Sequence, residues 1–400
     1  MHLHRRSFIL CLTTLLSLLT GCSTTHSPAT PQPPFFQSTP LYHAGDLGYT
    51  TFRVPGLICT PKGTLLLTVS ARKNGYTDWT EIHLLLRRST DNGKTWLPPQ
   101  LLVHIPKTPV DNACLFTAGS RVYMTYMVNY AHCYLITSDD QGATWSPPRD
   151  ITSAFDTYRT RDHFNWQVIA TGPGHGIVLR NGRFLIPILL STSHSHRPSI
   201  TSTIYSDDQG ATWHAGDVVT QNLPESKNPC ENVLIQLADG SVMDNIRCES
   251  PAHRRLVATS PDGSTHWTKP TPDPNLFDPV CFASLARYSF ASPTDPNSKN
   301  IILFCNPNSQ HADPIGNKAH MNIRKNITLR LSYDEGKSWP LSKVIDPDLS
   351  GYTDLAVSPD HTIFLAYEHG STDSAKTFSP QSLNIARLNL PWLISPPPSK

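Results

Sequence analysis

Short apolar runs recur along this chain, and turn-forming residues separate them. Runs of this length that are rich in Val, Ile, Leu, Thr and Tyr and are bounded by Gly, Pro, Asn or Asp are typical of β-strands. Between about residue 41 and residue 393 we find no convincing amphipathic helix. The pattern therefore predicts an all-β chain with strands that include Thr64–Ser70, Ile82–Arg88, Val122–Val128, Phe184–Leu190, Val233–Leu237, Ile301–Cys305, Asn326–Ser332 and Thr362–Tyr367.

An octapeptide follows several of these runs. Ser-Thr-Asp-Asn-Gly-Lys-Thr-Trp begins at Ser89, Ser-Asp-Asp-Gln-Gly-Ala-Thr-Trp begins at both Ser138 and Ser206, and Ser-Tyr-Asp-Glu-Gly-Lys-Ser-Trp begins at Ser332. A looser copy begins at Ser260. Asp accepts hydrogen bonds from nearby backbone amides, Gly supplies a positive φ, and Trp packs a turn against its own sheet. We interpret these Asp boxes as structural hairpin turns without a chemical role.

The spacing of the boxes predicts the architecture. Their aspartates are 49, 68, 54 and 72 residues apart, at Asp91, Asp140, Asp208, Asp262 and Asp334. A four-stranded propeller blade takes about 40–50 residues, and more with long loops. We therefore predict one domain over residues 41–393, a six-bladed β-propeller. Seven shorter blades, or a β-sandwich that carries turn motifs, are the alternatives.

The N-terminus has the pattern of an export signal. Arg5 and Arg6 precede an apolar run, Phe8–Leu19, which is too short to span a membrane as a helix. Leu-Thr-Gly-Cys, ending at Cys22, resembles a bacterial lipoprotein cleavage box, and this resemblance implies lipidation of Cys22. We predict a signal peptide over 1–22, a Ser/Thr/Pro-rich tether over 23–40 and a Pro-rich tail over 394–400. The protein is then an exported lipoprotein of the cell envelope, on the periplasmic or the outer-surface side. An ordinary secretory signal is the alternative, and the paired arginines also resemble a twin-arginine signal.

Charge and cysteine content exclude several classes of function. The chain has 33 basic and 31 acidic side chains, and loss of residues 1–22 removes two Arg and no acidic residue, which leaves 31 of each. This balance gives no reason to expect a nucleic-acid partner. Seven cysteines remain besides Cys11 and Cys22, without metal-type spacing. A disulfide between Cys230 and Cys248 is conceivable, but we expect buried free thiols.

Three arginines have sequence neighbours that are unusual for a surface arginine. Arg53 interrupts an apolar stretch just before Pro55, Arg247 follows Asp-Asn-Ile, and Arg324 precedes a predicted strand. Arginines on different blades of a propeller can converge at its axis. Converging guanidinium groups suit one ligand feature above all, a carboxylate held by charge-assisted hydrogen bonds.

Phe-Arg-Val-Pro at residues 52–55, followed by the Asp boxes, resembles the bacterial exo-α-sialidases (neuraminidases). The resemblance covers roughly residues 41–390. It implies that Arg53, Arg247 and Arg324 grip the carboxylate of sialic acid and that Arg72 lies near its C4 region. It implies further that Asp78 is the general acid and base, Tyr352 the nucleophile, Glu231 the base beside that tyrosine, and Glu368 the carboxylate that orients Arg53.

The chemistry agrees with these implied roles. Sialosides carry a carboxylate on the anomeric carbon, so a neutral tyrosine avoids the like-charge repulsion that an Asp or Glu nucleophile would meet, and sialidases are a known exception to the two-carboxylate scheme. A phenol needs a base within hydrogen-bond reach. We expect retention of configuration, no cofactor and no metal. His194 and His196 have no third ligand at useful spacing.

Three segments refine this expectation. Thr80 stands where many relatives have Gly, which reshapes the loop beside Asp78. Thr171–Ile177 fits a family segment that lines one side of the cleft. Asp156–Gln167 is unusually polar and aromatic, and it either contacts the substrate or is an ordinary exposed loop.

The resemblance leaves several functions open. The leading hypothesis is a monomeric, membrane-anchored exo-sialidase whose partners are sialylated glycoproteins, glycolipids or oligosaccharides. A related 2-keto sugar acid such as Kdn or Kdo is an alternative substrate, and transfer to another sugar is an alternative reaction. A propeller that binds sialoglycans without catalysis is a different class, but such a protein has no need of Asp78, Tyr352 and Glu231 together.

Overall fold

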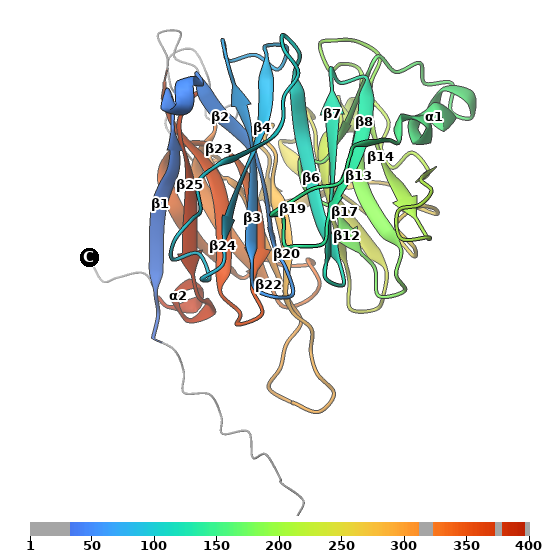
Figure 1. Ribbon diagram of the computed structural model, residues 1–400. Coiled ribbons are helices and arrows are strands. Elements are labelled where there is room, and N and C mark those ends of the chain that lie inside the picture. Colours follow the sequence, from blue (N-terminus) through green and yellow to red (C-terminus); the bar gives the residue numbers. More distant parts are fainter. Residues whose placement is uncertain (1–32, 312–322, 373–377, 397–400) are drawn as a thin grey trace, which may run out of the picture. The chain divides into compact units, whose positions relative to one another are not determined.

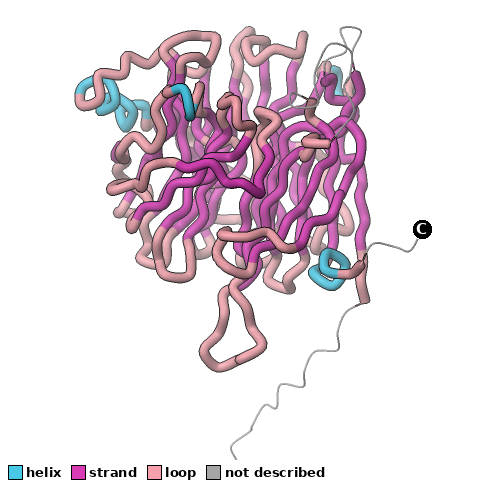
Figure 2. The backbone as a smooth tube through the Cα atoms, turned by 180° about the vertical axis from the view of Figure 1, so that it is seen from behind, coloured by secondary structure: helices cyan, strands magenta, loops and turns pink. Residues whose placement is uncertain are grey.

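The computed structural model describes residues 33–311, 323–372 and 378–396, which are almost wholly β-strand and loop (Figure 2). The helical elements of this part are α1 (Asp156–Thr160), α2 (Leu390–Ile394) and 3-10 turns at Asp46–Gly48, Thr152–Phe155 and Pro224–Ser226. None of the helices described is long and apolar enough to cross a membrane. The predicted signal peptide and Cys22 lie outside the described residues.

Four of the blades are separate antiparallel sheets. Blade one comprises β2 (Thr51–Cys59), β3 (Leu65–Arg72), β4 (Ile82–Ser89) and β5 (Gln100–Val103). Blade two comprises β6 (Val110–Ala118), β7 (Arg121–Val128), β8 (His132–Ser138) and β9 (Arg149–Asp150). Blade three comprises β10 (Val168–Thr171), β13 (Phe184–Ser191), β14 (Ser199–Ser206) and β15 (His214–Ala215). Blade four comprises β16 (Cys230–Gln236), β17 (Val242–Arg247), β18 (Arg254–Ser260) and β19 (Thr271–Phe277).

Blades five and six share one long strand, β23 (Leu341–Val357). Its first half pairs with β22 (Lys325–Ser332), which continues blade five through β21 (Ile301–Pro307) and β20 (Ser284–Ser289). Its second half pairs with β24 (Ile363–Thr372), which pairs with β25 (Phe378–Leu388) in blade six. The seven-stranded sheet is therefore two blades.

The ring closes through the N-terminal strand. β1 (Phe36–His43) pairs with β25, Phe36 opposite Leu388, and the two strands lie side by side in Figure 1. Contacts lead from blade to blade around the ring: β2 contacts β6, β6 contacts β10, β13 contacts β16, β16 contacts β20, β20 contacts β23, and β23 contacts β2 again. The prediction of a six-bladed propeller is confirmed.

The predicted tether is too long by one strand segment. Residues 36–40 belong to β1, because their backbone pairs with β25 and the Phe36 ring stacks on Trp392 at 4.5 Å. Of the Ser, Thr and Pro residues that suggested a tether, Ser38, Thr39 and Pro40 are on this outer strand, where a register shift follows Pro40. Proline is tolerated at such an edge position.

The apolar core lies between neighbouring blades. Rings of Phe116 and Phe184 meet at 5.2 Å, and those of Tyr123 and Phe184 at 5.0 Å, so β6 and β7 of blade two pack against β13 of blade three. The short strands β11 (Gly174–His175) and β12 (Ile177–Val178) pair with β6 and β13. Burial of these strand faces supplies the main driving force that holds one blade on the next.

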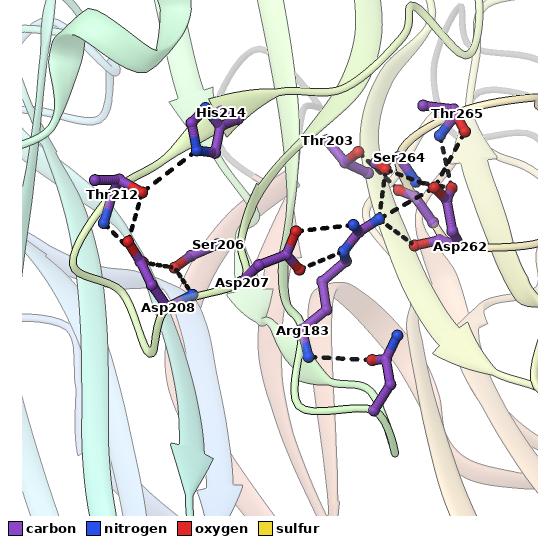
Figure 3. A network of polar contacts seen from close by, with 12 residues as sticks. Arg183, Thr203, Ser206, Asp207, Asp208, Thr212, His214, Asp262, Ser264 and Thr265 are labelled. Atoms are coloured by element: carbon purple, nitrogen blue, oxygen red, sulfur yellow. Dashed lines mark hydrogen bonds and ion pairs between the residues drawn. The ribbon is translucent and has the colours of Figure 1, made fainter.

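The Asp boxes form the turns that were predicted. Each begins at the last residue of the third strand of its blade, at Ser89, Ser138, Ser206, Ser260 and Ser332. Asp208 accepts hydrogen bonds from Ser206 Oγ at 2.8 Å and from the Thr212 amide and hydroxyl at 2.8 and 2.6 Å. Figure 3 shows this box beside that of Asp262, with Arg183 paired to Asp207 and Asp262 between them. The boxes thus lie at blade corners and also connect neighbouring blades.

All seven cysteines of the described residues are free thiols, and five of them are buried. Burial raises the pKa of Cys230 to about 12, and its strand pairs it opposite Arg247, not opposite Cys248. The expectation of free thiols is confirmed, and the alternative disulfide is wrong.

Candidate active site

Four blades bring the predicted arginines and carboxylates into one cleft. Arg53 is on β2 and Arg72 ends β3, with Asp78 in the loop that follows. Glu231 and Arg247 are on β16 and β17 of blade four, and Arg324 directly precedes β22 of blade five. Tyr352 and Glu368 are on β23 and β24 of blade six. Strand pairing within one blade does not bring residues of four blades together. They meet because the blades close into a ring.

Tyr352 lies at the centre of the cleft. Its hydroxyl donates a hydrogen bond to Glu231 Oε1, while Arg247 Nη1 donates to Glu231 Oε2 and, at 3.0 Å, to the Tyr352 hydroxyl oxygen. Burial raises the pKa of Tyr352 well above its usual value, Glu231 raises it further, and the nearby arginines oppose both effects. The phenol is therefore protonated in the resting site and hydrogen-bonded to a carboxylate that can accept its proton.

Two further guanidinium groups approach the ring of Tyr352. Arg53 Cζ lies 5.2 Å and Arg324 Cζ 5.5 Å from the ring centroid. Cations this close to an aromatic face stabilise it electrostatically and favour its deprotonated form. Arg324 is fixed by a hydrogen bond from Nη2 to the Val280 carbonyl at 2.7 Å. The three predicted arginines thus lie around one tyrosine side chain, Arg247 at its hydroxyl and Arg53 and Arg324 at its ring.

Glu368 holds Arg53 in place. Both Glu368 oxygens accept from Arg53, from Nε and Nη2 at 3.1 Å each, which is the bidentate geometry of a strong ion pair. The carboxylate is fully buried and also accepts from the amides of Val54 and Tyr352, at 3.0 and 3.1 Å. Glu368 therefore connects the first arginine to the strand that carries Tyr352.

The backbone beside Arg53 is strained. Val54 has φ 53°, a conformation that a β-branched residue rarely adopts, and the β2–β3 register shifts between Arg53 and Gly56. Such a bulge changes the direction of the neighbouring side chains. The hydrogen bond from the Val54 amide to Glu368 stabilises the bulge, so strain at this point is compensated by the carboxylate that also holds Arg53.

Asp78 is paired with Arg72 on the other side of the cleft. Arg72 Nη2 lies 2.5 Å from Asp78 Oδ1, and 46% of the Asp78 side chain is exposed whereas Arg72 is buried. Burial raises the pKa of the Asp78 carboxyl, but the charges of Arg72 and Arg53 outweigh it and hold the pKa below its usual value. Asp78 is the carboxyl of the cleft that solvent reaches most easily.

The structure adds residues to the cleft that sequence reasoning missed. Its lining includes Asp111, Asn112, Tyr130 and His196, and the space among these side chains measures about 40 Å³. Tyr130 donates to Asp111 Oδ2 at 3.0 Å, and the Asn112 amide donates to Asp111 Oδ1 at 2.7 Å. Asp-Asn within an otherwise apolar strand is the same kind of pattern that drew attention to Arg53, and it could have been found in the same way.

His196 is the missed residue with an unsatisfied atom. Within the described part of the chain, its Nε2 is buried and has no hydrogen-bond partner. Burial lowers the pKa of His196, against the opposing charges of Asp78 and Glu231. The neutral ring therefore contributes to the cleft wall without a fixed charge.

Two predicted segments lie elsewhere. Thr171–Ile177 runs through the ring interior, where His175 Nδ1 lies 2.8 Å from the buried Asp354 carboxylate; Ala170, just before it, lines the cleft. Asp156–Gln167 forms α1 and a turn outside the cleft lining. Its Arg159 stacks on Trp166 at 3.4 Å, so its polar and aromatic residues pack on one another and do not face the site.

One group of the described residues has metal-type ligand atoms in proximity. Asp346, Asp348 and His369 have ligand atoms within 4.8 Å of one another. His369 Nδ1 is 2.8 Å from Asp346 Oδ2, and the Asp348 amide donates to Asp346 Oδ1 at 2.9 Å. Internal hydrogen bonds account for this arrangement, and none of the three residues lines the cleft.

Comparisons with known proteins agree with the geometry. The family model described as a BNR repeat-like domain matches residues 107–365. A sialidase of Micromonospora viridifaciens is 30% identical over 97% of this chain and 60% of its own length, and a sialidase of Bacteroides fragilis is 28% identical over 82% and 61%. The chain thus spans about three fifths of these relatives. A solved structure of a Hadza microbial sialidase is 26% identical, with a TM-score of 0.73 over 89% of this chain and 69% of that one. The chain belongs to the family of BNR repeat-like domains, and four of its five Asp boxes lie within the matched residues.

Proposed function

We propose that this protein is a retaining exo-α-sialidase, which hydrolyses terminal sialic acid from glycoproteins, glycolipids or oligosaccharides. One observation carries the proposal: the hydroxyl of Tyr352 is hydrogen-bonded to a buried carboxylate, and three guanidinium groups on different blades lie around this tyrosine side chain. A carboxylate on the anomeric carbon of a substrate fits this charge distribution, and a neutral nucleophile fits that substrate.

Arg53, Arg247 and Arg324 bind the substrate carboxylate. Since Arg53 and Arg247 are already paired with Glu368 and Glu231, each can orient its remaining N–H groups toward the ligand without reorganisation. Arg72, which lines the cleft beside Asp78, contacts the ring substituents near C4 in this proposal. Binding fixes the anomeric carbon next to the Tyr352 oxygen.

The first chemical step forms a glycosyl-enzyme. Tyr352 Oη attacks the anomeric carbon while its proton passes to Glu231, with which it is already hydrogen-bonded. Asp78, in its protonated form, donates a proton to the glycosidic oxygen as that bond breaks. The arginine charges near Tyr352 stabilise the developing phenolate.

The second step releases the sugar. The ionised Asp78 removes a proton from water, which attacks the anomeric carbon as the bond to Tyr352 breaks, and Glu231 returns its proton to the phenolate. Two displacements at one carbon give net retention. Asp78 is suited to this second role, because its lowered pKa makes the ionised form the resting state.

We further propose that the protein acts as a monomer in the cell envelope, exported through signal 1–22 and anchored by a lipid on Cys22. Replacement of Cys22 by Ser should release the enzyme from the membrane fraction without change in its specific activity. Membrane retention of the Cys22→Ser protein would contradict the anchor.

Assay of the purified chain on an aryl α-sialoside, followed by proton NMR, tests the function. The α-anomer of free sialic acid should appear first. The β-anomer as first product would contradict the mechanism, and binding without turnover would indicate a sialoglycan-binding protein. Turnover of Kdn or Kdo glycosides alone would identify a different sugar acid, and a glycosylated acceptor as the main product would identify a transferase.

A further inference from the structure

Trp79 directly follows the proposed acid Asp78 in the sequence. Its ring centroid is 5.1 Å from that of Tyr130, 4.7 Å from that of His194 and 5.7 Å from that of His196. Tyr130 and His196 line the cleft, whereas Trp79 is outside the lining. Trp79 therefore packs against two residues of the cleft wall and adjoins the acid in the chain.

The indole is both held and exposed. The contacts with His194 and His196 are edge-to-face, with interplanar angles of 68° and 83°, a geometry that aromatic rings favour. Yet 37% of Trp79 is accessible to solvent. A large aromatic surface that is already ordered loses little conformational entropy when a ligand packs on it. The exposed part of Trp79 is thus a prepared binding surface.

The chemistry of the proposed reaction determines what arrives at this surface. Asp78 must come within about 2.6–3.2 Å of the glycosidic oxygen, so the first residue of the aglycone lies beside the Asp78 carboxyl. The guanidinium groups of Arg53, Arg72 and Arg247 lie in the cleft interior, where they suit the carboxylate of the charged sugar. An aglycone sugar is neutral and presents C–H groups on its ring faces, and apolar surface of this kind packs favourably on an aromatic ring.

We propose that Trp79 is the platform for the aglycone sugar and that it makes a pyranoside leaving group preferred over a small alcohol. The inference rests on the proposed sialidase function and concerns its specificity. His194 and His196 are positioning residues, because they hold the indole and do not themselves contact the leaving sugar.

The test compares two substrates that differ in aglycone size and share an alkyl leaving group. Sialyllactose carries a sugar at the scissile bond, and methyl α-sialoside carries a methyl group. Both need protonation by Asp78, so damage to the acid lowers both rates. For Trp79→Ala we expect kcat/KM on sialyllactose to fall roughly 10-fold and kcat/KM on the methyl glycoside to stay within about twofold. On sialyllactose, kcat/KM of Trp79→Phe should lie between the values of the unsubstituted protein and of Trp79→Ala.

Two controls separate the alternatives. Phe290→Ala removes another exposed aromatic, 42% accessible and outside the cleft lining, and should change neither rate. Binding of an unsaturated sialic acid analogue without an aglycone should be unchanged in Trp79→Ala. Three results for Trp79→Ala would each contradict the proposal that Trp79 is the aglycone platform: equal losses of kcat/KM on both substrates, no loss on either substrate, or weakened binding of the analogue. Absence of turnover in the unsubstituted chain is a distinct result, because it contradicts the sialidase function itself.

Discussion

Carboxylates are used in two ways in this molecule, at the box turns and in the cleft. At a box, Asp208 is satisfied by neutral donors no more than four residues away. In the cleft, Glu368 pairs with Arg53 across 315 residues of sequence, and Glu231 accepts from Tyr352 across 121. The box of Asp208 is a local unit, whereas the contacts of Glu368 with Arg53 and of Glu231 with Tyr352 require the closed ring. Local hydrogen bonds stabilise the scaffold, and long-range charge pairs create the chemistry.

The largest expected effect is the loss of turnover when Tyr352 in the cleft is replaced. Tyr352→Phe removes the nucleophilic oxygen, so kcat on an aryl sialoside should fall by about 10³-fold or more. Tyr367→Phe is the matched control, because Tyr367 is a buried tyrosine of blade six whose hydroxyl contacts Ser38, at 2.8 Å, outside the cleft. Near-normal turnover by Tyr352→Phe would refute the mechanism.

Asp78→Asn should follow in size. Loss of a general acid costs about 10²–10⁴-fold when the leaving group needs a proton, so hydrolysis of sialyllactose should fall accordingly. The phenolate of an aryl sialoside with an acidic phenol leaves without protonation, so the rate of hydrolysis of this substrate should fall much less. Asp91→Asn makes the same change at the box carboxylate that is nearest to Asp78 in the sequence, and it should leave the rates on both substrates almost unchanged. A uniform loss on both substrates in Asp78→Asn would argue against the acid role.

Arg72→Gln tests the electrostatics of the cleft. Because kcat/KM requires protonated Asp78, it declines as pH rises through the pKa of that carboxyl. Arg72 lowers this pKa and burial raises it, so removal of the positive charge should move the alkaline limb of the profile to higher pH. The readout is the pH of the limb, since lost contacts also lower the overall rate. A limb that stays in place or moves to lower pH would contradict the pairing.

Asp262→Ala should affect stability and spare activity. Asp262 accepts from the Ser264 and Thr265 amides at 2.9 and 2.8 Å and pairs with Arg183 (Figure 3). Loss of these hydrogen bonds should lower the free energy of unfolding by about 1–3 kcal/mol in chemical denaturation. Asp207→Ala removes the other Arg183 partner without disturbing the box, and an exposed pair of this kind contributes less than about 1 kcal/mol. Equal costs for the two variants would mean that the box turn is not the stabilising element.

The smallest expected effect is a loss of the stability that the box carboxylates contribute when the pH is lowered. Hydrogen bonds from Thr and Ser lower the pKa of Asp91, Asp140 and Asp208 from 3.8 to about 2. A carboxyl with a depressed folded-state pKa contributes stability above its unfolded value, and this is lost as pH falls through the folded one. The difference in melting temperature between the parent and Asp140→Ala should therefore shrink between about pH 4 and pH 2. A constant difference across this window would show that ionisation at the box is irrelevant.

The same distinction explains what the sequence could predict. Boxes and short apolar runs are local, so blade number and strand positions follow from the chain directly. The arginines were visible because Arg53 interrupts an apolar stretch, Arg247 follows Asp-Asn-Ile, and Arg324 precedes a predicted strand. Glu231, Tyr352 and Glu368 have no such local pattern, and family resemblance identified them.

Other features needed the fold. The end of the tether was wrong because pairing of Phe36–Pro40 with β25 has no local trace in the sequence. His196 and Trp79 gain their positions from the contact between a loop of blade one and a loop of blade three. Asp111 was within reach of sequence reasoning, since it interrupts an apolar strand as Arg53 does.

The closing of blade six by β1 has a consequence for biosynthesis. Tyr352 and Glu368 are in the last blade to be completed, and its outer strand β1 precedes every other described strand in the sequence. A nascent chain that ends before residue 350 contains the strands of five blades but has neither the proposed nucleophile nor the partner of Arg53. A chain shortened in this way therefore keeps most of the scaffold without the proposed chemistry, which arises only after β1 has paired with β25.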